Sequence, residues 1–253
     1  MTPSWLSRFE LKPGAWVFVP TADTIATGRE IKQAIQERWQ APSNYFHLQN
    51  GGHVAALRSH IENSWFVHLD IKDFFGSINR SRVTRALKPL FGYVQARAIT
   101  NGSTVIHPER GEYILPFGFV QSPIISSICL YKSALGHCLQ RLGQTGVAVS
   151  VYVDDIILSA KDLPLIQQAL EAVKHSAERA RFRLNDTKEE GPADKITAFN
   201  IDLSTQKLAI SSERLAELVA SYQAADSSHK QMGILGYVAS VSQDQTNEVL
   251  KSP

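Results

Sequence analysis

The feature that most constrains this chain is a pair of adjacent aspartates, Asp154 and Asp155, set between two apolar segments. Residues 147–153 and 156–159 consist mainly of aliphatic and β-branched side chains. Such segments favour strands, and an acidic pair between them predicts a hairpin with the carboxylates at its turn. An acidic turn alone is usually a solvated β-turn. Two carboxylates between buried strands are costly unless cations compensate for their charge, so this pair indicates a cation site.

A third aspartate, Asp70, ends another predicted buried strand over residues 65–69. Carboxylate oxygens are the ligands that hard divalent cations prefer. Two such ions about 3.5–4 Å apart can clamp the attacking and leaving oxygens of a phosphoryl displacement. Asp70, Asp154 and Asp155 are therefore candidate ligands. Neighbouring strand residues point to opposite faces, so only one of the pair is expected in full contact unless the turn rotates the other inward; we favour Asp154.

Helical and strand patterns alternate irregularly along the rest of the chain. Apolar residues at helical spacing predict helices over residues 28–39, 163–183, 211–222 and 230–241, and another that begins behind a cap near Ser81. The apolar segment after residue 123 predicts one mostly buried helix, and residues 196–210 predict a second hairpin. This order predicts an α+β fold with an antiparallel sheet.

Composition excludes several other classes of protein. The chain is 43% hydrophobic and 20% charged, which predicts a globular core, and its net charge of +2 permits a nucleic-acid partner without requiring one. Cys129 and Cys138 both lie in an apolar segment, which excludes a disulfide framework and a four-cysteine zinc site and fits a reducing cytoplasm. The sequence has neither a signal-peptide pattern nor a membrane-length apolar run, so we expect a cytoplasmic protein without a membrane partner.

Three histidines recur in the segment that precedes the first predicted strand: His47, His53 and His60. Their spacing matches no metal-binding motif. We therefore interpret them as structural or backbone-contacting residues.

Several motifs, in this order, resemble those of the reverse transcriptases. Residues 69–75 (LDIKDFF) resemble the first catalytic motif of that family, residues 115–123 resemble the motif that cradles the incoming nucleotide, and residues 152–155 (YVDD) resemble the catalytic Tyr-X-Asp-Asp box. Downstream, Leu184-Asn185 with Lys188 resembles the next motif, and residues 199–201 resemble the primer-grip region. The first motif and the short length resemble the bacterial branch, which contains retron, group II intron-like, abortive-infection and defence-associated enzymes.

The resemblance implies a right-hand polymerase. Residues 1–63 would form the N-terminal part of the fingers, and residues 64–210 would form an antiparallel-sheet palm that carries the carboxylates. A further part of the fingers would be inserted near residues 80–113, and residues 211–253 would form a short helical thumb.

The resemblance also implies catalytic roles. Asp70 and Asp154 would hold two Mg²⁺ ions, or Mn²⁺ in their place, with support from Asp155 and from the backbone carbonyl of Ile71. Lys188 would donate a proton or a positive charge to the departing pyrophosphate. An exposed lysine in a charged run is nearly as good an interpretation of Lys188.

Nucleotide contacts are implied for a further set of residues: Ile71, Lys72, Phe75, Phe117, Gly118, Gln121 and Arg58. Phe75 matches the position beneath the sugar, where a bulky ring leaves no room for a 2′-hydroxyl and favours deoxynucleotides. Most relatives have Pro-Gln-Gly where this chain has Pro-Phe-Gly at residues 116–118. Phe117 can stack but cannot hydrogen-bond through its side chain, so nucleotide selection or template handling is expected to differ.

The implied function is that of an RNA-directed DNA polymerase, template-independent in some lineages, in bacterial anti-phage defence. Its partners would be deoxynucleoside triphosphates, an RNA or DNA template-primer, and a noncoding RNA or partner protein, in a homo- or hetero-oligomer. The alternative is a catalytically weak nucleic-acid-binding palm subunit that scaffolds a noncoding RNA or a protein. The Tyr-X-Asp-Asp box and Phe75 argue against a nucleotide cyclase and an RNA-dependent RNA polymerase.

Overall fold

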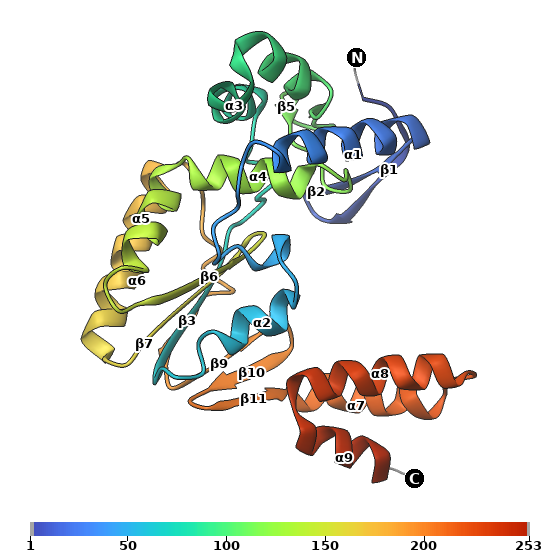
Figure 1. Cartoon of the computed structure of the whole chain (residues 1–253), viewed down its shortest axis with the longest axis vertical. Coiled ribbons are helices and arrows are strands. Elements are labelled where there is room, and N and C mark those ends of the chain that lie inside the picture. The colour runs from blue at the N-terminus through green and yellow to red at the C-terminus, as the bar shows by residue number, and fades with distance from the viewer. Residues whose placement is uncertain (1–2, 252–253) are drawn as a thin grey trace.

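A four-stranded antiparallel sheet carries the segments that contain the three aspartates (Figure 1). In the computed structural model, which describes residues 3–251, its strands lie in the order β6, β7, β3, β8. They are β3 (Trp65–Asp70), β6 (Ala148–Tyr152), β7 (Asp155–Ala160) and β8 (Glu190–Ala193). Helices pack around this sheet, which confirms the predicted α+β fold with an antiparallel sheet.

The register of this sheet brings two of the aspartates opposite each other. In the pairing of β3 with β7, Asp70 lies across from Asp155. Strands β6 and β7 form the predicted hairpin, in which Tyr152 pairs with Asp155 and leaves Val153 and Asp154 as the two turn residues. The acidic pair is therefore divided between the turn and the first position of β7.

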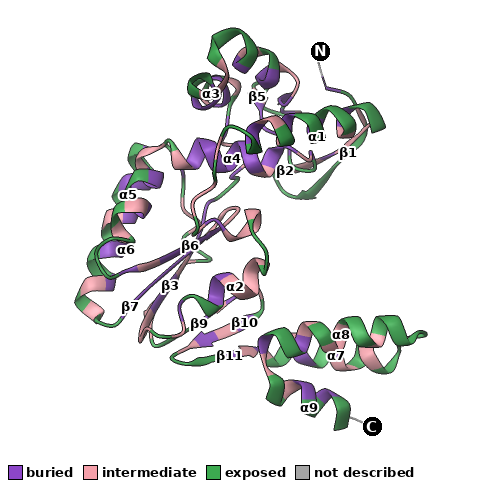
Figure 2. Cartoon of the chain, viewed as in Figure 1, coloured by how far each residue is buried: buried purple, intermediate pink, exposed green. Residues whose placement is uncertain are grey.

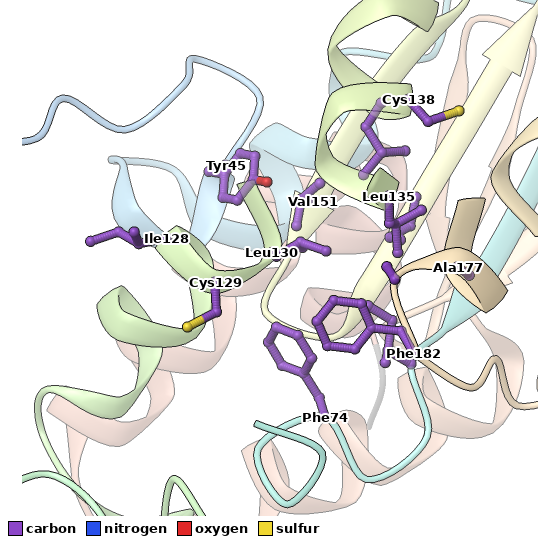
Figure 3. Packing of buried hydrophobic residues seen from close by; sticks show 14 of the residues in the cluster. Tyr45, Phe74, Ile128, Cys129, Leu130, Leu135, Cys138, Val151, Ala177 and Phe182 are labelled. Atoms are coloured by element: carbon purple, nitrogen blue, oxygen red, sulfur yellow. The ribbon is translucent and has the colours of Figure 1, made fainter. Parts of the chain in front are cut away.

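The larger hydrophobic core lies between the central sheet and two helices. These are α5 (Ala134–Leu142) and α6 (Leu163–Arg179). Leu69 of β3 points to this side of the sheet, and Leu170 lies on the apolar face that α6 buries against the strands. Phe74 and Phe182 face each other in the same core, with ring centroids 5.7 Å apart (Figure 3).

The opposite face of the central sheet is covered by a short helix and a three-stranded meander. These elements are α2 (Gly52–Arg58), β9 (Lys195–Ala198), β10 (Ile201–Ser204) and β11 (Lys207–Ile210). Phe66 and Ile157 point to this side and pack with Leu57 of α2 and Ile196 of β9. The predicted hairpin over residues 196–210 is confirmed in β10 and β11, to which β9 adds a third strand.

The boundaries of the helices in the first half of the chain differ from those predicted. The helices are α1 (Ala22–Gln36), α3 (Arg80–Asn101) and α4 (Ser122–Tyr131). Helix α1 begins before Gly28 because the side chain of Thr21 caps it. Helix α3 begins near Ser81 as predicted, and the side chain of Asn79 caps it. The apolar segment predicted as one helix is two, because the side chain of Ser133 caps α5 directly after α4 ends.

An N-terminal hairpin was not predicted. It consists of β1 (Trp5–Lys12) and β2 (Ala15–Pro20), and a second small hairpin pairs β4 (Val105–Ile106) with β5 (Tyr113–Ile114). Phe18 of β2 is fully buried in a small core with Ile114 and Phe119. Phe18 N also donates to the carbonyl of Phe117 at 3.0 Å, so the hairpin holds the loop that contains Phe117.

Three helices at the C-terminus extend from the end of β11 (Figure 1). They are α7 (Ser212–Gln223), α8 (Ser228–Val241) and α9 (Gln243–Lys251). The first two were predicted and the third was not. Much of their surface is exposed (Figure 2), and Gln245 of α9 ties them to the sheet by hydrogen bonds to both the N–H and the carbonyl of Ile210. No helix within residues 3–251 is long and apolar enough to span a membrane.

Candidate active site

Asp70, at the end of β3, is held by two residues of the segment that follows α6. Asn185 Nδ2 donates to Asp70 Oδ1 at 3.1 Å, and Lys188 Nζ donates to Asp70 Oδ2 at 2.6 Å. The backbone N–H of Asn185 also donates to the carbonyl of Asp70 at 2.9 Å. The hydrogen bond to Asp70 raises the pKa of Lys188 above its usual range, which favours the charged ammonium group further. The structure thus brings Lys188 and Asn185 directly to Asp70, which is itself buried.

Asp155 is bonded by a histidine that the sequence did not single out as functional. His68 Nε2 lies 2.8 Å from Asp155 Oδ1. The two side chains share a face of the sheet because His68 pairs with Ile157, two positions after Asp155. The available signal in the sequence was weak: His68 is a polar residue in an apolar strand, two positions before Asp70 and therefore on the same face.

Asp154 lies in the turn between β6 and β7 and is tied to the first motif through its backbone. Its carbonyl accepts a hydrogen bond from Ile71 N at 2.9 Å. Burial and, after it, the negative charges of Asp155 and Asp70 raise the pKa of the Asp154 carboxyl group to about 6, against the opposing charge of Lys188. The three carboxylates are close enough to repel one another. A cation beside Asp154 would relieve that repulsion.

The carboxylates of this site are suitable ligands for a hard divalent cation, but in this structure their oxygens contact other side chains of the protein. Among the described residues, no group of three His, Cys, Asp or Glu side chains is arranged to hold a metal ion. Asn185 and Lys188 occupy both oxygens of Asp70, and His68 occupies one oxygen of Asp155. The residues fit a divalent cation in chemical type and in charge, and each oxygen of Asp70 accepts only one of these hydrogen bonds.

Phe75 and Phe117 form a stacked pair at one side of the site. Their ring centroids are 5.6 Å apart and the planes differ by 16°. Phe117 is 46% exposed. Its loop is held against β2, where Gly118 adopts a φ of +108° and approaches the carbonyl of Phe18 so closely that a side chain would collide with it. Two residues predicted to contact the nucleotide thus form one aromatic surface.

Three other residues predicted to contact the nucleotide are placed elsewhere. Gln121 is 1% exposed, and its amide lies in the interior 3.4 Å from the carbonyl of Gly102. Its burial contradicts a direct nucleotide contact in this conformation. Arg58 donates to the carbonyl of Ser240 in α8 at 2.7 Å. Lys72 is exposed and lines a hollow of about 600 Å³ beside the end of α6, together with residues 181–184.

An open groove of about 730 Å³ lies between the turn that joins β9 to β10 and the helices α7 and α8. Phe199 and Asn200 form that turn, both with positive φ, and Arg214 and Lys230 line the helical side. The ring of Tyr152 lies 5.2 Å from that of Phe199. The groove therefore begins beside the Tyr-Val-Asp-Asp turn.

Comparison with known proteins identifies a family. The model of the family "Reverse transcriptase (RNA-dependent DNA polymerase)" matches residues 20–238. The sequence matches no curated protein.

Two groups of solved structures share the fold. The foamy viral protease-reverse transcriptase in complex with double-stranded DNA has a TM-score of 0.53 and 16% identity, over 93% of this chain and 35% of that chain. Telomerase from Candida albicans, in complex with a fragment of telomeric RNA, has a TM-score of 0.55 and 13% identity, over 91% of this chain and 48% of that chain. The chain thus spans less than half of the length of these proteins, and identities this low show a common fold alone.

Proposed function

The chain belongs to the reverse transcriptase family, and on that premise we propose that it joins deoxynucleotides to a primer on an RNA or DNA template. The observation that carries this proposal is the convergence of three carboxylates from two motifs far apart in the sequence. Asp70 and Asp155 lie opposite each other in one sheet, and the pKa of Asp154 rises because of burial and of both neighbouring charges. Repulsion of this kind is a common feature of sites that bind cations.

We assign the metal ligands within this set. Asp70 and Asp154 would hold Mg²⁺, Asp155 would support them, and the carbonyl of Ile71 would complete the coordination. When bound, Mg²⁺ would supply the positive charge that activates the primer hydroxyl and stabilises the transferred phosphoryl group. His68 holds the Asp155 carboxylate in one orientation through its 2.8 Å contact. Asn185 does the same for Asp70.

Lys188 supplies a mobile positive charge to this site. Its Nζ contacts Asp70, and the charges of Asp154 and Asp155 also raise its pKa. Because its side chain is 47% exposed, the ammonium group has room to leave Asp70. We propose that it then neutralises the departing pyrophosphate.

The stacked pair Phe75 and Phe117 would select the sugar. A ring at position 75 closes the space that a 2′-hydroxyl needs, and the parallel ring of Phe117 limits the movement of Phe75. The groove beside Phe199 would receive the primer strand, with Arg214 and Lys230 positioned to contact its phosphates.

The biological setting is a narrower proposal that rests on sequence motifs. We propose a cytoplasmic enzyme of bacterial anti-phage defence that synthesises DNA with or without a template. A noncoding RNA, a partner protein or a further copy of the chain would assist its grip on the duplex.

The test is incorporation of labelled nucleotides by the purified chain with Mg²⁺, with and without a primed RNA template. The control is the double variant Asp154→Asn, Asp155→Asn. Template-dependent extension that is lost in the variant supports an ordinary reverse transcriptase, and extension without template that is lost in the variant supports the untemplated chemistry.

Two results would count against the proposal. Equal use of ribonucleotides would contradict the role of the aromatic pair. Absence of incorporation on every template, with nucleic acid still bound, would favour the scaffolding alternative.

A further inference from the structure

The turn that carries Asp154 contains a residue in a strained backbone conformation. Val153 has a φ of +60°. A β-branched side chain rarely adopts this left-handed region, because the conformation is strained and persists only where the surrounding structure holds it in place. A two-residue hairpin requires a positive φ here, because its twist then matches that of the flanking strands. Pairing of the flanking strands imposes this strained conformation, and contacts from outside the hairpin can stabilise it further.

His47 makes the contact that holds this turn. The backbone N–H of Val153 donates to His47 Nδ1 at 2.9 Å. The other ring nitrogen, His47 Nε2, lies 2.7 Å from the hydroxyl of Ser127, and that hydroxyl donates to the carbonyl of Pro123 at 2.7 Å. One imidazole thus connects the turn at Asp154 with the first turn of α4.

These contacts define the tautomer of His47. A backbone N–H can only donate, so Nδ1 must be unprotonated. The single hydroxyl proton of Ser127 is directed to the carbonyl of Pro123, so the hydroxyl oxygen accepts from Nε2–H. Burial lowers the pKa of His47 to about 4, against the opposing effect of the Val151 backbone, and the ring is therefore neutral at physiological pH.

The segment around His47 also braces the strand that enters the turn. Val151 N donates to the carbonyl of Asn44 at 2.8 Å, and Tyr45 forms a parallel bridge with Val151. The ring of His47 meets that of Tyr152 edge-on at 5.8 Å. The end of β6 and the turn are thus held by one short segment that lies outside the central sheet.

We propose that His47 is a positioning residue that keeps the turn in its strained conformation and thereby fixes the position of Asp154 relative to Asp70. Without an acceptor at Nδ1, the Val153 amide would lose its partner and the turn could relax to a negative φ. That rotation would move the Asp154 carbonyl, which accepts from Ile71 N. The catalytic consequence rests on the proposed function, whereas the hydrogen bond and the tautomer do not.

Three substitutions separate the two nitrogens of the ring. In His47→Asn, the amide oxygen can occupy the position of Nδ1 and accept from Val153. In His47→Gln, the longer amide reaches the position of Nε2 and keeps the contact to Ser127 only. His47→Phe removes both contacts at similar volume. His137→Gln, an exposed position on α5, is the control.

The first readout does not depend on activity. In the wild type, the ¹⁵N resonances of His47 should show an unprotonated Nδ1 and a protonated Nε2. Hydrogen exchange of the Val153 amide should be about fivefold faster or more in His47→Gln and His47→Phe, because the loss of one hydrogen bond corresponds to a factor of that order, and near wild type in His47→Asn and His137→Gln. The opposite tautomer, or unchanged exchange in His47→Gln, overturns the proposal. If these variants do not fold, Ser127→Ala still tests it, because loss of the acceptor at Nε2 should also accelerate Val153 exchange.

The second readout is nucleotide incorporation. The maximal rate should fall at least about tenfold in His47→Gln, with partial recovery in His47→Asn and little change in KM for the nucleotide. A wild type that shows the expected tautomer and exchange but no incorporation contradicts the proposed function and leaves the role of His47 in the turn intact. An active wild type whose rate is unaffected in His47→Gln and His47→Phe contradicts the positioning role.

Discussion

The rings of Phe75 and Phe117 stack with their centroids 5.6 Å apart and their planes 16° from parallel. Phe75 follows β3, whereas Phe117 lies in a loop that is held by β2 through the hydrogen bond from Phe18 N. The contact therefore joins the residue expected beneath the sugar to the residue that replaces the usual glutamine. We therefore expect selection against a 2′-hydroxyl to depend on both rings.

Replacement of Phe75 by alanine should open the sugar position. We expect the preference for deoxynucleotides over ribonucleotides to fall at least about tenfold, because the 2′-hydroxyl gains the volume of the ring. Competing incorporation of dCTP and CTP, expressed as the ratio of kcat/KM values, measures the effect. Phe74→Leu, a change in the core beside it, is the control for general loosening. An unchanged ratio in Phe75→Ala would remove Phe75 from sugar selection.

Replacement of Phe117 tests whether its ring supports that selection. In Phe117→Ala the stack is lost, and we expect the sugar preference to fall by roughly two- to tenfold, in line with the 0.5–1.5 kcal/mol of an aromatic pair. Phe117→Tyr should retain both the stack and the preference. If the alanine and tyrosine variants behave alike, the stack does not contribute to selectivity.

Removal of the charge of Asp154 should stabilise the protein and abolish its activity. The carboxyl group has a pKa of about 6 because burial and the neighbouring Asp155 and Asp70 disfavour its charged form. At pH 8 the folded state carries this unfavourable charge, so Asp154→Asn should raise the melting temperature by about 2–4 °C. Addition of Mg²⁺ should stabilise the wild type more than the variant. Glu171→Gln, on the exposed side of α6, should change neither property.

Two results would contradict these expectations for Asp154. Equal stabilisation of the wild type and of Asp154→Asn by Mg²⁺ would show that this carboxylate is not a ligand. A lower melting temperature in the variant at pH 8 would show that the charge is compensated in the fold.

The stability of the protein should fall as the pH falls below about 6.5, in part because of His60. This ring is fully buried between the hydroxyls of Ser159 and Ser150, at 2.7 and 2.8 Å, and burial lowers its pKa to about 3. Because the folded protein holds this ring neutral, the free energy of unfolding is not reduced by His60 at pH values above its unfolded pKa. It falls progressively as the pH drops from the unfolded pKa towards the folded pKa. At pH 5 the loss is ~2 kcal/mol.

The measurement for His60 is the free energy of unfolding in urea at pH 7 and pH 5. His60→Gln should be less stable at both values, but the difference between them should shrink by ~2 kcal/mol. The control is His229→Gln, an exposed position in α8. A variant with the same pH difference as the wild type would assign the acid sensitivity to other groups.

Prediction from sequence succeeded where the pattern is local. The hairpin at the acidic pair follows from two apolar segments and the turn between them, and β3 follows from an apolar run that only His68 interrupts. Helix boundaries were less accurate because single capping contacts decide them, as Asn79 and Ser133 do for α3 and α5. The N-terminal hairpin was missed although residues 9–12 alternate between apolar and polar side chains, because most of β1 is exposed and the pattern is too short to mark a buried face.

The candidate site was predicted in part. Asp70, Asp154 and Lys188 were expected together on account of their motifs, and the structure brings them together. Gln121 was expected at the nucleotide, but its amide is buried against the carbonyl of Gly102. His68 was missed because a single histidine in a strand carries no chemical signal until the register places it beside Asp155.

The sequence alone determined which chemical groups this protein holds and which short segments present them, because strand alternation and turn preferences act between near neighbours in the chain. The tertiary structure alone decided which groups meet. Register pairs Asp70 with Asp155, loop docking stacks Phe117 on Phe75, and the segment before α2 brings His47 to Val153. These contacts join residues far apart in sequence, and their geometry depends on the packing of all the intervening elements.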